Sequence, residues 1–506
     1  MSVLVQGSVK RTLFRTAFPM LAGTFAMNAY HLADTWFVAR LGTLSLAAMG
    51  FTFPVVMLLT FVAGGIGTGV TTLTSHALGR QDRAAASRLV SHGFALSMLI
   101  AGLMALVGYH TITPVFSALG ADARTLPLIG DYMRTWYAGA ATMTLPMLGN
   151  GILIALGDSR AASQFIMIGT LLNLVLDPIM IFGWLGCPAW GIFGASLATV
   201  ISQGVGTAWL FHLLIVKHRL LAFRPAEIAL IPESWRNIMR FAVPAVISMM
   251  LMPISSAVIT GLVSRFGTEA VAACGAASRL EMVAFVIPMA LGISLTPFIS
   301  QNFGAGRLDR IREAKSLAMR FALAYGLGNA VLFFLAARHL AGFFTDDPAV
   351  TGILVSYVRI IAWGYGMMEV HRYCGFIMTG LQRPAAATTL NGIRVLVLLL
   401  PLSFLGAWLG GIRGIFWGRL ATDLAVGSIG LAWVTRLLAT HPGISGPVGQ
   451  PAGAGMAAPA ARAAATLDPN GRQLPPANVP PAPTVNPSAP PTPTDGQSAS
   501  SPERKP

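Results

Sequence analysis

The chain has little charge and little cysteine. Only 10% of its 506 residues are Asp, Glu, Lys or Arg, and its mean hydropathy is +0.67. This composition excludes a soluble domain built around one core, because such a domain needs a charged surface. Its three cysteines lie far apart, in or beside apolar segments. The sequence therefore predicts neither a disulfide framework nor a metal site.

The chain also lacks the short alternating segments of a membrane β-barrel. Runs such as 51–70 and 395–408 are continuously apolar, as helices must be when every backbone hydrogen bond closes within the segment. No cleavable signal peptide is predicted, because the first apolar span continues to about Val38. A signal peptide's apolar region has only about 7 to 15 residues. We therefore expect a polytopic, all-α membrane protein.

An internal repeat is the most informative feature present. Residues recur in the same order at an interval of 225 positions, over more than 130 residues of chain. The recurring pairs are Pro19 and Pro244, Gly42 and Gly267, Gly50 and Gly275, Gly67 and Gly292, Thr71 and Thr296, Gly79 and Gly304, Tyr132 and Tyr357, Arg134 and Arg359, and Leu156 and Leu381. Two copies of one membrane-embedded half are typical of transporters with a site between the repeats.

Apolar runs and their Gly, Pro and charge boundaries predict twelve helices. Their expected ranges are 14–39, 46–74, 88–115, 126–156, 161–184, 190–216, 236–264, 270–299, 314–338, 349–379, 385–408 and 412–438. They form a first lobe at 1–220 and a second at 221–440. Because six helices return the chain in its starting orientation, the lobes are related by a pseudo-two-fold axis along the membrane normal. Residues 441–506, rich in Pro and Ala, are expected to form a disordered tail.

Basic residues cluster at the N-terminus and in the second, sixth and eighth loops, whereas the odd loops are poor in them. The positive-inside rule therefore places both termini and the even loops in the cytoplasm. The same distribution accounts for a net charge of +15 without a nucleic-acid partner. The partners we expect are the lipid bilayer and small molecules, and we expect a monomer.

Two acids inside predicted spans of the first half are candidate functional residues. Asp34 and Asp177 lie at matching depths, about 25 to 29 Å from the cytoplasmic side at 1.5 Å per residue. Asn173 is one turn before Asp177, and Thr199 reaches a similar depth. Such oxygen ligands suit a small cation or a shared proton. The alternative is that these groups only cap or crosslink helices, and that Asp177-Pro178 marks a kink.

The second half does not repeat this cluster. At the 225 interval, Asp34 corresponds to Ile259 and Asp177 to Leu402. The second half instead carries five intramembrane ionisable residues: Glu281, Glu369, His371, Arg394 and Asp423. We treat the first four as a secondary polar site. Glu281 could pair with a neighbouring helix, and Glu369 with His371 could form a proton relay or an internal salt bridge beside Arg372. Adaptable cavity walls are expected at Tyr137, Met143, Met249 and Met252.

Several motifs together resemble the multidrug and toxic compound extrusion (MATE) family. The resemblance covers about residues 10–440 and rests on 32–42, 46–50, 173–178, 191–199, 267–275 and 300–304. It implies two six-helix lobes that open outward, in a bacterial cytoplasmic (inner) membrane. It also implies that Asp34, Asn173, Asp177 and Thr199 bind the coupling ion, H⁺ or Na⁺, and that the first helix bends at Pro19 when this site is loaded.

The resemblance implies proton- or sodium-coupled export of organic, mostly cationic and amphipathic compounds, with no enzymatic activity and no cofactor. No acid follows Pro244 in the seventh helix, where another branch of the family has a glutamate. The chain thus resembles the DNA-damage-inducible (DinF-like) subgroup. The alternatives are a lipid-linked oligosaccharide flippase of the same superfamily, for which Arg394 is the main argument, and a membrane-embedded enzyme, for which no paired catalytic motif is found.

Overall fold

The computed structural model describes residues 3–221 and 224–440. The predicted tail at 441–506 lies outside the described residues. Across the described ranges the regular structure is helical, with no strand. Nine helices in these ranges are long and apolar enough to cross a membrane, or ten if the bent pair α4 and α5 is one span. The chain is therefore a multi-pass membrane protein.

The first half builds six spans. Their helices are α1 (Val9–Ala39), α2 (Thr43–Gly79), α3 (Arg83–Ala118), α4 (Thr125–Ala138), α5 (Ala140–Ala155), α6 (Ser159–Phe182) and α7 (Gly191–His212). The π-helical turn η3 (Leu213–Lys217) continues α7. Helices α4 and α5 form one span with a bend of 54° at Gly139.

The second half begins with the 3-10 helix η4 (Pro225–Leu230) and also builds six spans. Its helices are α8 (Ile231–Val263), α9 (Thr268–Gly304), α10 (Leu308–Gly342), α11 (Pro348–Ile361), α12 (Tyr365–Gly380), α13 (Pro384–Gly392) and α14 (Leu400–Thr440). The 3-10 turn η6 (Ala362–Gly364) joins α11 to α12, and the π-helix η7 (Ile393–Leu399) joins α13 to α14. Helix α14 holds two spans, because Gly410 and Gly411 leave the helical conformation where the predicted boundary falls.

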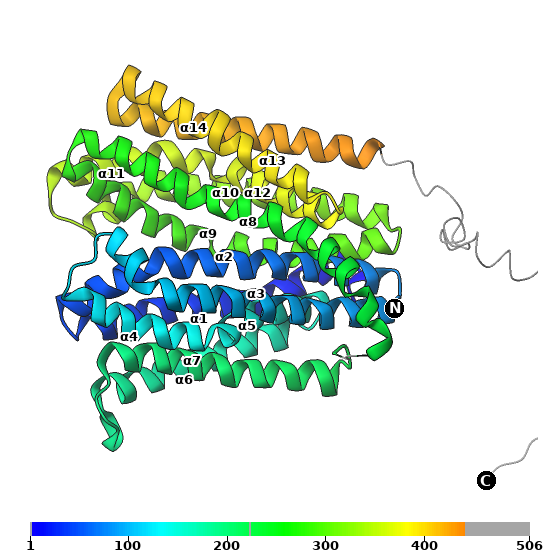
Figure 1. The fold of residues 1–506 in the computed structure, drawn as a ribbon. Helices are drawn as coiled ribbons and strands as arrows, with labels where there is room; N and C mark the ends of the chain where they lie inside the picture. The colour runs from blue at the N-terminus through cyan, green and yellow to red at the C-terminus, as the bar shows by residue number, and fades with distance from the viewer. Residues whose placement is uncertain (1–2, 222–223, 441–506) are drawn as a thin grey trace, which may run out of the picture. The chain divides into compact units, whose positions relative to one another are not determined.

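The 225-residue repeat is present in the backbone. Helix α9 has the bounds of α2 shifted by 225 at both ends, and α12 has those of α5. Gly42 and Gly267 precede α2 and α9 with φ of 109° and 103°, a conformation that glycine adopts without strain. Gly157 and Gln382, also 225 apart, have φ of 77° and 64°. The two halves are thus copies of one fold, and Figure 1 shows α1–α7 (blue to green) beside α8–α14 (green to orange).

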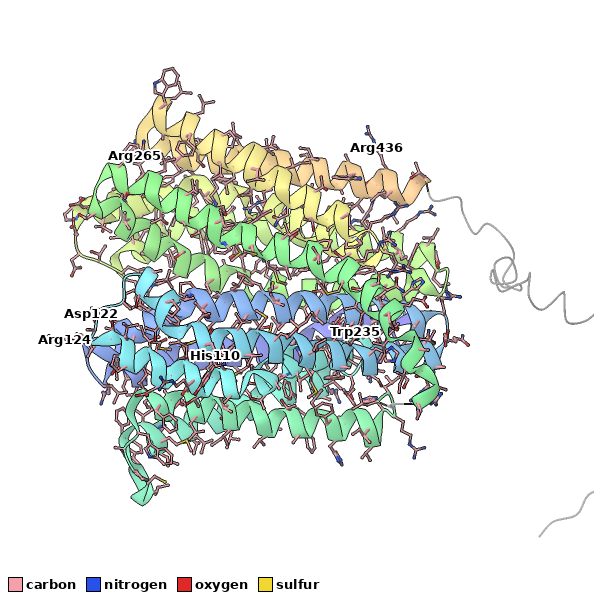
Figure 2. All side chains as sticks on the ribbon, in the orientation of Figure 1. His110, Asp122, Arg124, Trp235, Arg265 and Arg436 are labelled. Carbon is pink, nitrogen blue, oxygen red and sulfur yellow. The ribbon has the colours of Figure 1, made fainter. Side chains whose placement is uncertain are left out.

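The two ends of the helix bundle differ. The N-terminus, the loop between α2 and α3, and the start of α8 share one end, which we call the basic end (Figure 1). Trp235 and Arg436 lie toward this end, whereas Asp122, Arg124 and Arg265 lie at the opposite end (Figure 2). The even loops, which carry most of the loop Lys and Arg, are therefore together.

The lobes meet at the basic end through a symmetric crossing of α2 and α9. Gly79 leaves no room for a Cβ against the backbone carbonyl of Gln301, and Gly304 leaves none against that of His76. Gly79 and Gly304 are repeat partners, and so are His76 and Gln301. This reciprocal contact is what a pseudo-two-fold axis between the lobes requires.

Further contacts between the lobes surround this crossing. The Ser300 hydroxyl donates to the Thr72 carbonyl at 2.7 Å, and Trp235 Nε1 donates to the His92 carbonyl at 3.0 Å. Arg310 of α10, which is 7% exposed, donates to the carbonyls of residues 4, 6 and 7 and to Asn302 Oδ1. The chain leading into α1 is thereby bound to the second lobe at the basic end.

Candidate functional site

The first lobe holds a cluster of buried polar side chains where α6 packs against α1 and α7. Asn173 Nδ2 donates to Asp177 Oδ1 at 3.2 Å and to Thr199 Oγ1 at 3.3 Å. The first contact follows from the spacing of four residues, which stacks two side chains on one helix face. The Tyr30 hydroxyl lies 3.4 Å from Thr199 Oγ1 and so adds α1 to the cluster.

Asp34 faces the same region from α1. It is 5% exposed and Asp177 is 0% exposed, and the two carboxylates are near enough for their charges to interact. Three buried oxygens of the cluster accept no hydrogen bond: Asp34 Oδ1, Asn173 Oδ1 and Asp177 Oδ2. The cluster therefore offers buried oxygen acceptors that no described protein group uses.

No basic side chain neutralises these acids in the part of the chain that the structure describes. None of its ion pairs includes Asp34 or Asp177. A buried carboxylate without a partner is strongly disfavoured, so it takes up a proton or binds a cation. The donor set of carboxylate, amide and hydroxyl oxygens fits H⁺ or a hard cation such as Na⁺.

Pro19 lies inside α1, fifteen residues before Asp34. The helix is continuous past it, from Val9 to Ala39. Proline removes one backbone hydrogen bond and weakens a helix at its position. The predicted bend therefore has a local cause, on the same helix as Asp34.

The second lobe holds a different arrangement, in which one buried acid, Asp423, and one partly buried acid, Glu281, are paired with arginines. Arg419 of α14 approaches Glu281 of α9 at 2.8 Å, and Arg394 of η7 approaches Asp423 of α14 at 3.1 Å. Arg419 Nε also lies 3.9 Å from Asp423 Oδ2, which links the two pairs. The Tyr357 hydroxyl donates to Glu281 Oε1 at 3.0 Å. We call these five residues the arginine network.

The remaining ionisable residues of the predicted secondary polar site lie on α12. Glu369, 1% exposed, forms an ion pair with Arg372 at 3.0 Å on the next turn of the same helix. Of the two possibilities left open by the sequence, this contact is the internal salt bridge. His371 lies within electrostatic range of both Arg394 and Arg372. Glu281 and Arg394 therefore belong to the arginine network, Glu369 pairs with Arg372 on its own helix, and His371 lies near both groups.

The residues expected to line a cavity are scattered. Tyr137 is buried, because its ring packs where Gly108 of α3 leaves space. Met143 packs against the same core. Met249 of α8 contacts the backbone at Gly64 across the lobe interface, and Met252 is 73% exposed.

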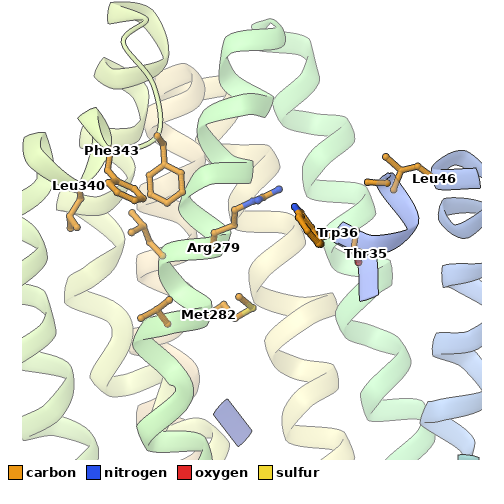
Figure 3. Close-up of a pocket in the computed structure, with 11 residues that line it drawn as sticks. Thr35, Trp36, Leu46, Arg279, Met282, Leu340 and Phe343 are labelled. Carbon is orange, nitrogen blue, oxygen red and sulfur yellow. The ribbon is translucent and has the colours of Figure 1, made fainter. Parts of the chain in front are cut away.

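A pocket of about 820 Å³ lies between the lobes, toward the end of the helix bundle that is opposite the basic end. The first lobe contributes Thr35, Trp36, Ala39 and Leu46, and the second contributes residues of α9 with Leu340, Phe343 and Phe344 from the end of α10. Arg279 extends from α9 toward Trp36 (Figure 3). None of the four residues expected to line a cavity is among its lining residues.

Four residues at these sites are not among the predicted site residues: Tyr30, Tyr132, Tyr357 and Arg419. Tyr132 is buried within electrostatic range of Asp34, and Tyr357 contacts Glu281 and Arg419. Tyr132 and Tyr357 are repeat partners, so their recurrence was a usable signal. Arg419 gave no such signal, because it is 138 residues from Glu281 and its repeat partner is Gly194.

Comparison with known proteins identifies the family. The family model MatE matches residues 19–179 and 244–405, two stretches whose starts are 225 residues apart. The chain belongs to the MatE family. It is therefore a membrane transporter of a family that acts on small molecules.

Individual relatives span almost the same length as this chain. It is 34% identical over 424 residues to a FAD transporter of Shewanella oneidensis, covering 84% of this chain and 94% of the relative. It is 24% identical over 421 residues to the multidrug export protein MepA of Staphylococcus aureus, with coverages of 82% and 91%. Members of the MatE family with these two different names are thus both similar to this chain.

Solved MatE structures share the fold. The structure of the Vibrio cholerae transporter VcmN in the bent form superposes with a TM-score of 0.81 at 30% identity, covering 85% of this chain and 97% of VcmN. A transporter from Pyrococcus furiosus, whose title speaks of a binding pocket of reverse polarity, gives a TM-score of 0.79 at 25% identity, with coverages of 86% and 97%. The twelve-helix, two-lobe architecture is therefore that of known transporters.

Proposed function

We propose that this chain is a secondary active transporter that exports small organic compounds in exchange for H⁺ or Na⁺. We propose further that Asp34, Asn173, Asp177 and Thr199 bind the coupling ion. One observation carries this proposal: the first lobe buries two neighbouring carboxylates with no described basic partner. To bind and release its ion in each transport cycle, this buried site must become accessible to water at some stage of the cycle.

Coupling then follows from the position of the cluster on α1. Loading the site with one monovalent cation leaves Asp34 and Asp177 with one negative charge between them instead of two, and so relieves the repulsion between them. Helix α1 can respond at Pro19, where a backbone hydrogen bond is missing. Arg310 of the second lobe binds the segment that precedes α1. A bend of α1 at Pro19 therefore acts on the contact that holds the lobes together at the basic end. One charge crossing 100 mV supplies about 2.3 kcal/mol to this cycle.

The proposed orientation places the basic end and both termini in the cytoplasm, and the protein as a monomer in the bacterial inner membrane. The distribution of Lys and Arg among the loops supports this orientation. We also propose the DinF-like subgroup, because α8 has no acid after Pro244 and the second lobe's acids are paired with arginines. Coupling then belongs to the first lobe alone.

The substrate is the second part of the proposal. Cationic amphipathic compounds are the substrates expected from the sequence, and the similarity to MepA supports multidrug export. FAD export is a second candidate, because 84% of the chain aligns with a FAD transporter at 34% identity. The flippase alternative loses its main argument, because Arg394 is occupied by Asp423.

Efflux from proteoliposomes tests the proposal. Vesicles loaded with ethidium or with FAD are given a pH gradient and, separately, a sodium gradient, with the Asp34→Asn variant measured in parallel. We expect one gradient to drive export of one of the two compounds, and the variant to lose this response. Export at a rate that depends on neither gradient, or an Asp34→Asn variant that exports at the wild-type rate, would refute ion coupling at this site.

A further inference from the structure

We infer that the pocket between the lobes recognises an organic anion with a planar aromatic ring system, through Arg279 and Trp36. This inference rests on the proposed transport function and names the substrate class of the pocket. It reverses the expectation of a cationic substrate. Three features of the pocket support it: its charge, the aromatic rings that line it and its volume.

Arg279 supplies the charge. It is exposed in the pocket, and it is the charged residue among the lining side chains. Arg372, Arg394 and Arg419 of the same lobe are each paired with an acid, whereas no described ion pair includes Arg279. An available guanidinium in an apolar cleft favours a carboxylate or phosphate, which it can bind with two parallel hydrogen bonds. The same charge repels an organic cation.

Aromatic rings stand on both sides of this guanidinium. Trp36 from α1 is 52% exposed, and Phe343 at the end of α10 is 87% exposed. Phe343 and Phe344 form an edge-to-face pair with ring centroids 5.7 Å apart. Exposed rings that border a pocket are available to stack against a flat ligand.

Arg40 adds to the positive charge near Trp36. Its guanidinium carbon lies 4.2 Å from the centroid of the Trp36 ring. This contact covers part of the indole and fixes its orientation. The Trp36 side of the pocket therefore has a positive group as well, so both lobes present a cation beside a ring.

The size of the pocket fits a drug- or nucleotide-sized molecule. Its volume of about 820 Å³ lies within the common range of about 300 to 1,000 Å³ for ligand sites. The remaining lining side chains used here, such as Leu46 and Met282, are apolar. A ligand with one anionic group and a flat ring system would meet a matching surface on each side.

Binding of three matched probes to the full-length protein in nanodiscs tests this inference. FMN and riboflavin share one ring system but differ by a phosphate, and ethidium is a flat cation. We expect the wild type to bind FMN most tightly. Arg279→Gln should weaken FMN binding about tenfold or more, as expected for loss of a charge-assisted hydrogen-bonded pair. Riboflavin binding should change less than about twofold by the same argument.

Two further variants and one control complete the test. Arg279→Lys should retain part of the FMN preference, and Trp36→Leu should weaken both flavins together. Arg265→Gln, an exposed arginine at the same end outside the pocket lining (Figure 2), should change nothing. Equal affinity of the wild type for FMN and riboflavin, or an Arg279→Gln variant that binds FMN like the wild type, would overturn the inference.

The binding test is separable from the test of coupling. The binding measurement needs no ion gradient, whereas the export measurement does. Gradient-driven export of ethidium without an FMN preference would remove this inference and leave the proposed function. An FMN preference that depends on Arg279, with no gradient-driven export, would support the binding site and contradict the proposed transport function.

Discussion

The two lobes are copies of one fold that treat buried acids in opposite ways. In the first lobe, Asp34 and Asp177 have no described basic partner, whereas in the second lobe Glu281 and Asp423 each lie against an arginine. A resident arginine neutralises an acid permanently, so no position is left for a mobile ion. The comparison teaches that the same helices can hold either a loading site or a fixed electrostatic link between helices.

Neither arrangement has a counterpart in the other copy. Glu281 corresponds to Val56 and Arg419 to Gly194, just as Asp34 corresponds to Ile259. The shared backbone therefore does not determine which acids each lobe carries. If the acids of the two lobes differ in function as they differ in partners, their variants should fail in different measurements.

The largest expected effect is on stability, in the arginine network. Arg419→Met leaves Glu281 without its ion-pair partner. Breaking a fully buried pair costs about 3 to 5 kcal/mol, and these side chains, 21% and 13% exposed, should lie near the lower figure. We expect the apparent Tm in detergent to fall by roughly 6 °C or more. The double variant Glu281→Gln with Arg419→Met should recover part of this loss. A single variant that melts within about 2 °C of the wild type would show that the network is not a structural link.

The next effect is on transport, in the first lobe. Asp34→Asn keeps the size of the side chain and removes its charge, so we expect gradient-driven export to fall at least about tenfold, which is about 1.4 kcal/mol. The apparent Tm should not fall, because the variant removes an unpaired buried charge. Asp131→Asn, an exposed acid on α4, is the matched control. If Asp34→Asn folded poorly but its folded fraction exported at the wild-type rate, Asp34 would stabilise the fold and would not couple the ion.

A smaller effect is expected at the seal between the lobes. Arg310→Met removes the hydrogen bonds to the carbonyls of Leu4 and Gly7. Because water replaces part of these hydrogen bonds, the free energy that favours the closed form of the basic end should fall by about 1 kcal/mol. This is a several-fold shift in the ratio of closed to open protein. Maleimide labelling of a Ser75→Cys protein, buried at this interface, measures the shift.

Arg312 provides the control for this experiment. It is exposed and donates to the Leu438 carbonyl within its own lobe. Arg312→Met should leave the labelling rate of the Ser75→Cys protein unchanged. Equal rates in all three backgrounds would mean that Arg310 does not hold the lobes together.

The smallest effect concerns an acid outside the membrane spans. Asp158 precedes α6 and lies 2.5 Å from Lys217 and 3.1 Å from His218. Burial alone would raise the pKa of Asp158, but the hydrogen bond and charge of Lys217 and the N–H of Ala161 outweigh it and lower the pKa below the ordinary 3.8. The ion pair thus stabilises the fold above about pH 4 and loses this contribution as the pH falls through the lowered pKa.

Asp158→Asn isolates that contribution, since asparagine can still cap α6. We expect the variant to be less stable by under about 1 kcal/mol at pH 7, because Lys217 is half exposed. The difference should shrink in melting curves as the pH falls through the lowered pKa of Asp158, and vanish below it. A difference that persists at low pH would assign it to the cap instead of the ion pair.

Much of the fold could be predicted from the sequence, because the repeat constrains both copies at once. The sequence predicts helices at 46–74 and 270–299, and α2 and α9 contain these ranges but begin at Thr43 and Thr268. Within the first-lobe site, the contact of Asn173 with Asp177 follows from one helical turn. The packing of α1 against α6, which brings Asp34 near, could only be inferred from equal depth.

The second lobe could not be derived in the same way. Its contacts join residues far apart in sequence, such as Glu281 and Arg419, with no periodicity or recurrence to connect them. Depth alone grouped Glu369 with Arg394, although they face different partners. The pocket between the lobes depends on how α1, α9 and the end of α10 are placed relative to one another, which the spacing of residues along each helix does not determine.

The most direct test measures two neutralised acids in one export assay. Asp34→Asn and Glu369→Gln each remove one buried carboxylate, one without a described basic partner and one paired with Arg372. Driven by whichever gradient powers the wild type, Asp34→Asn should lose the response and Glu369→Gln should keep most of it. Loss in Glu369→Gln with retention in Asp34→Asn would place coupling in the second lobe and contradict the account.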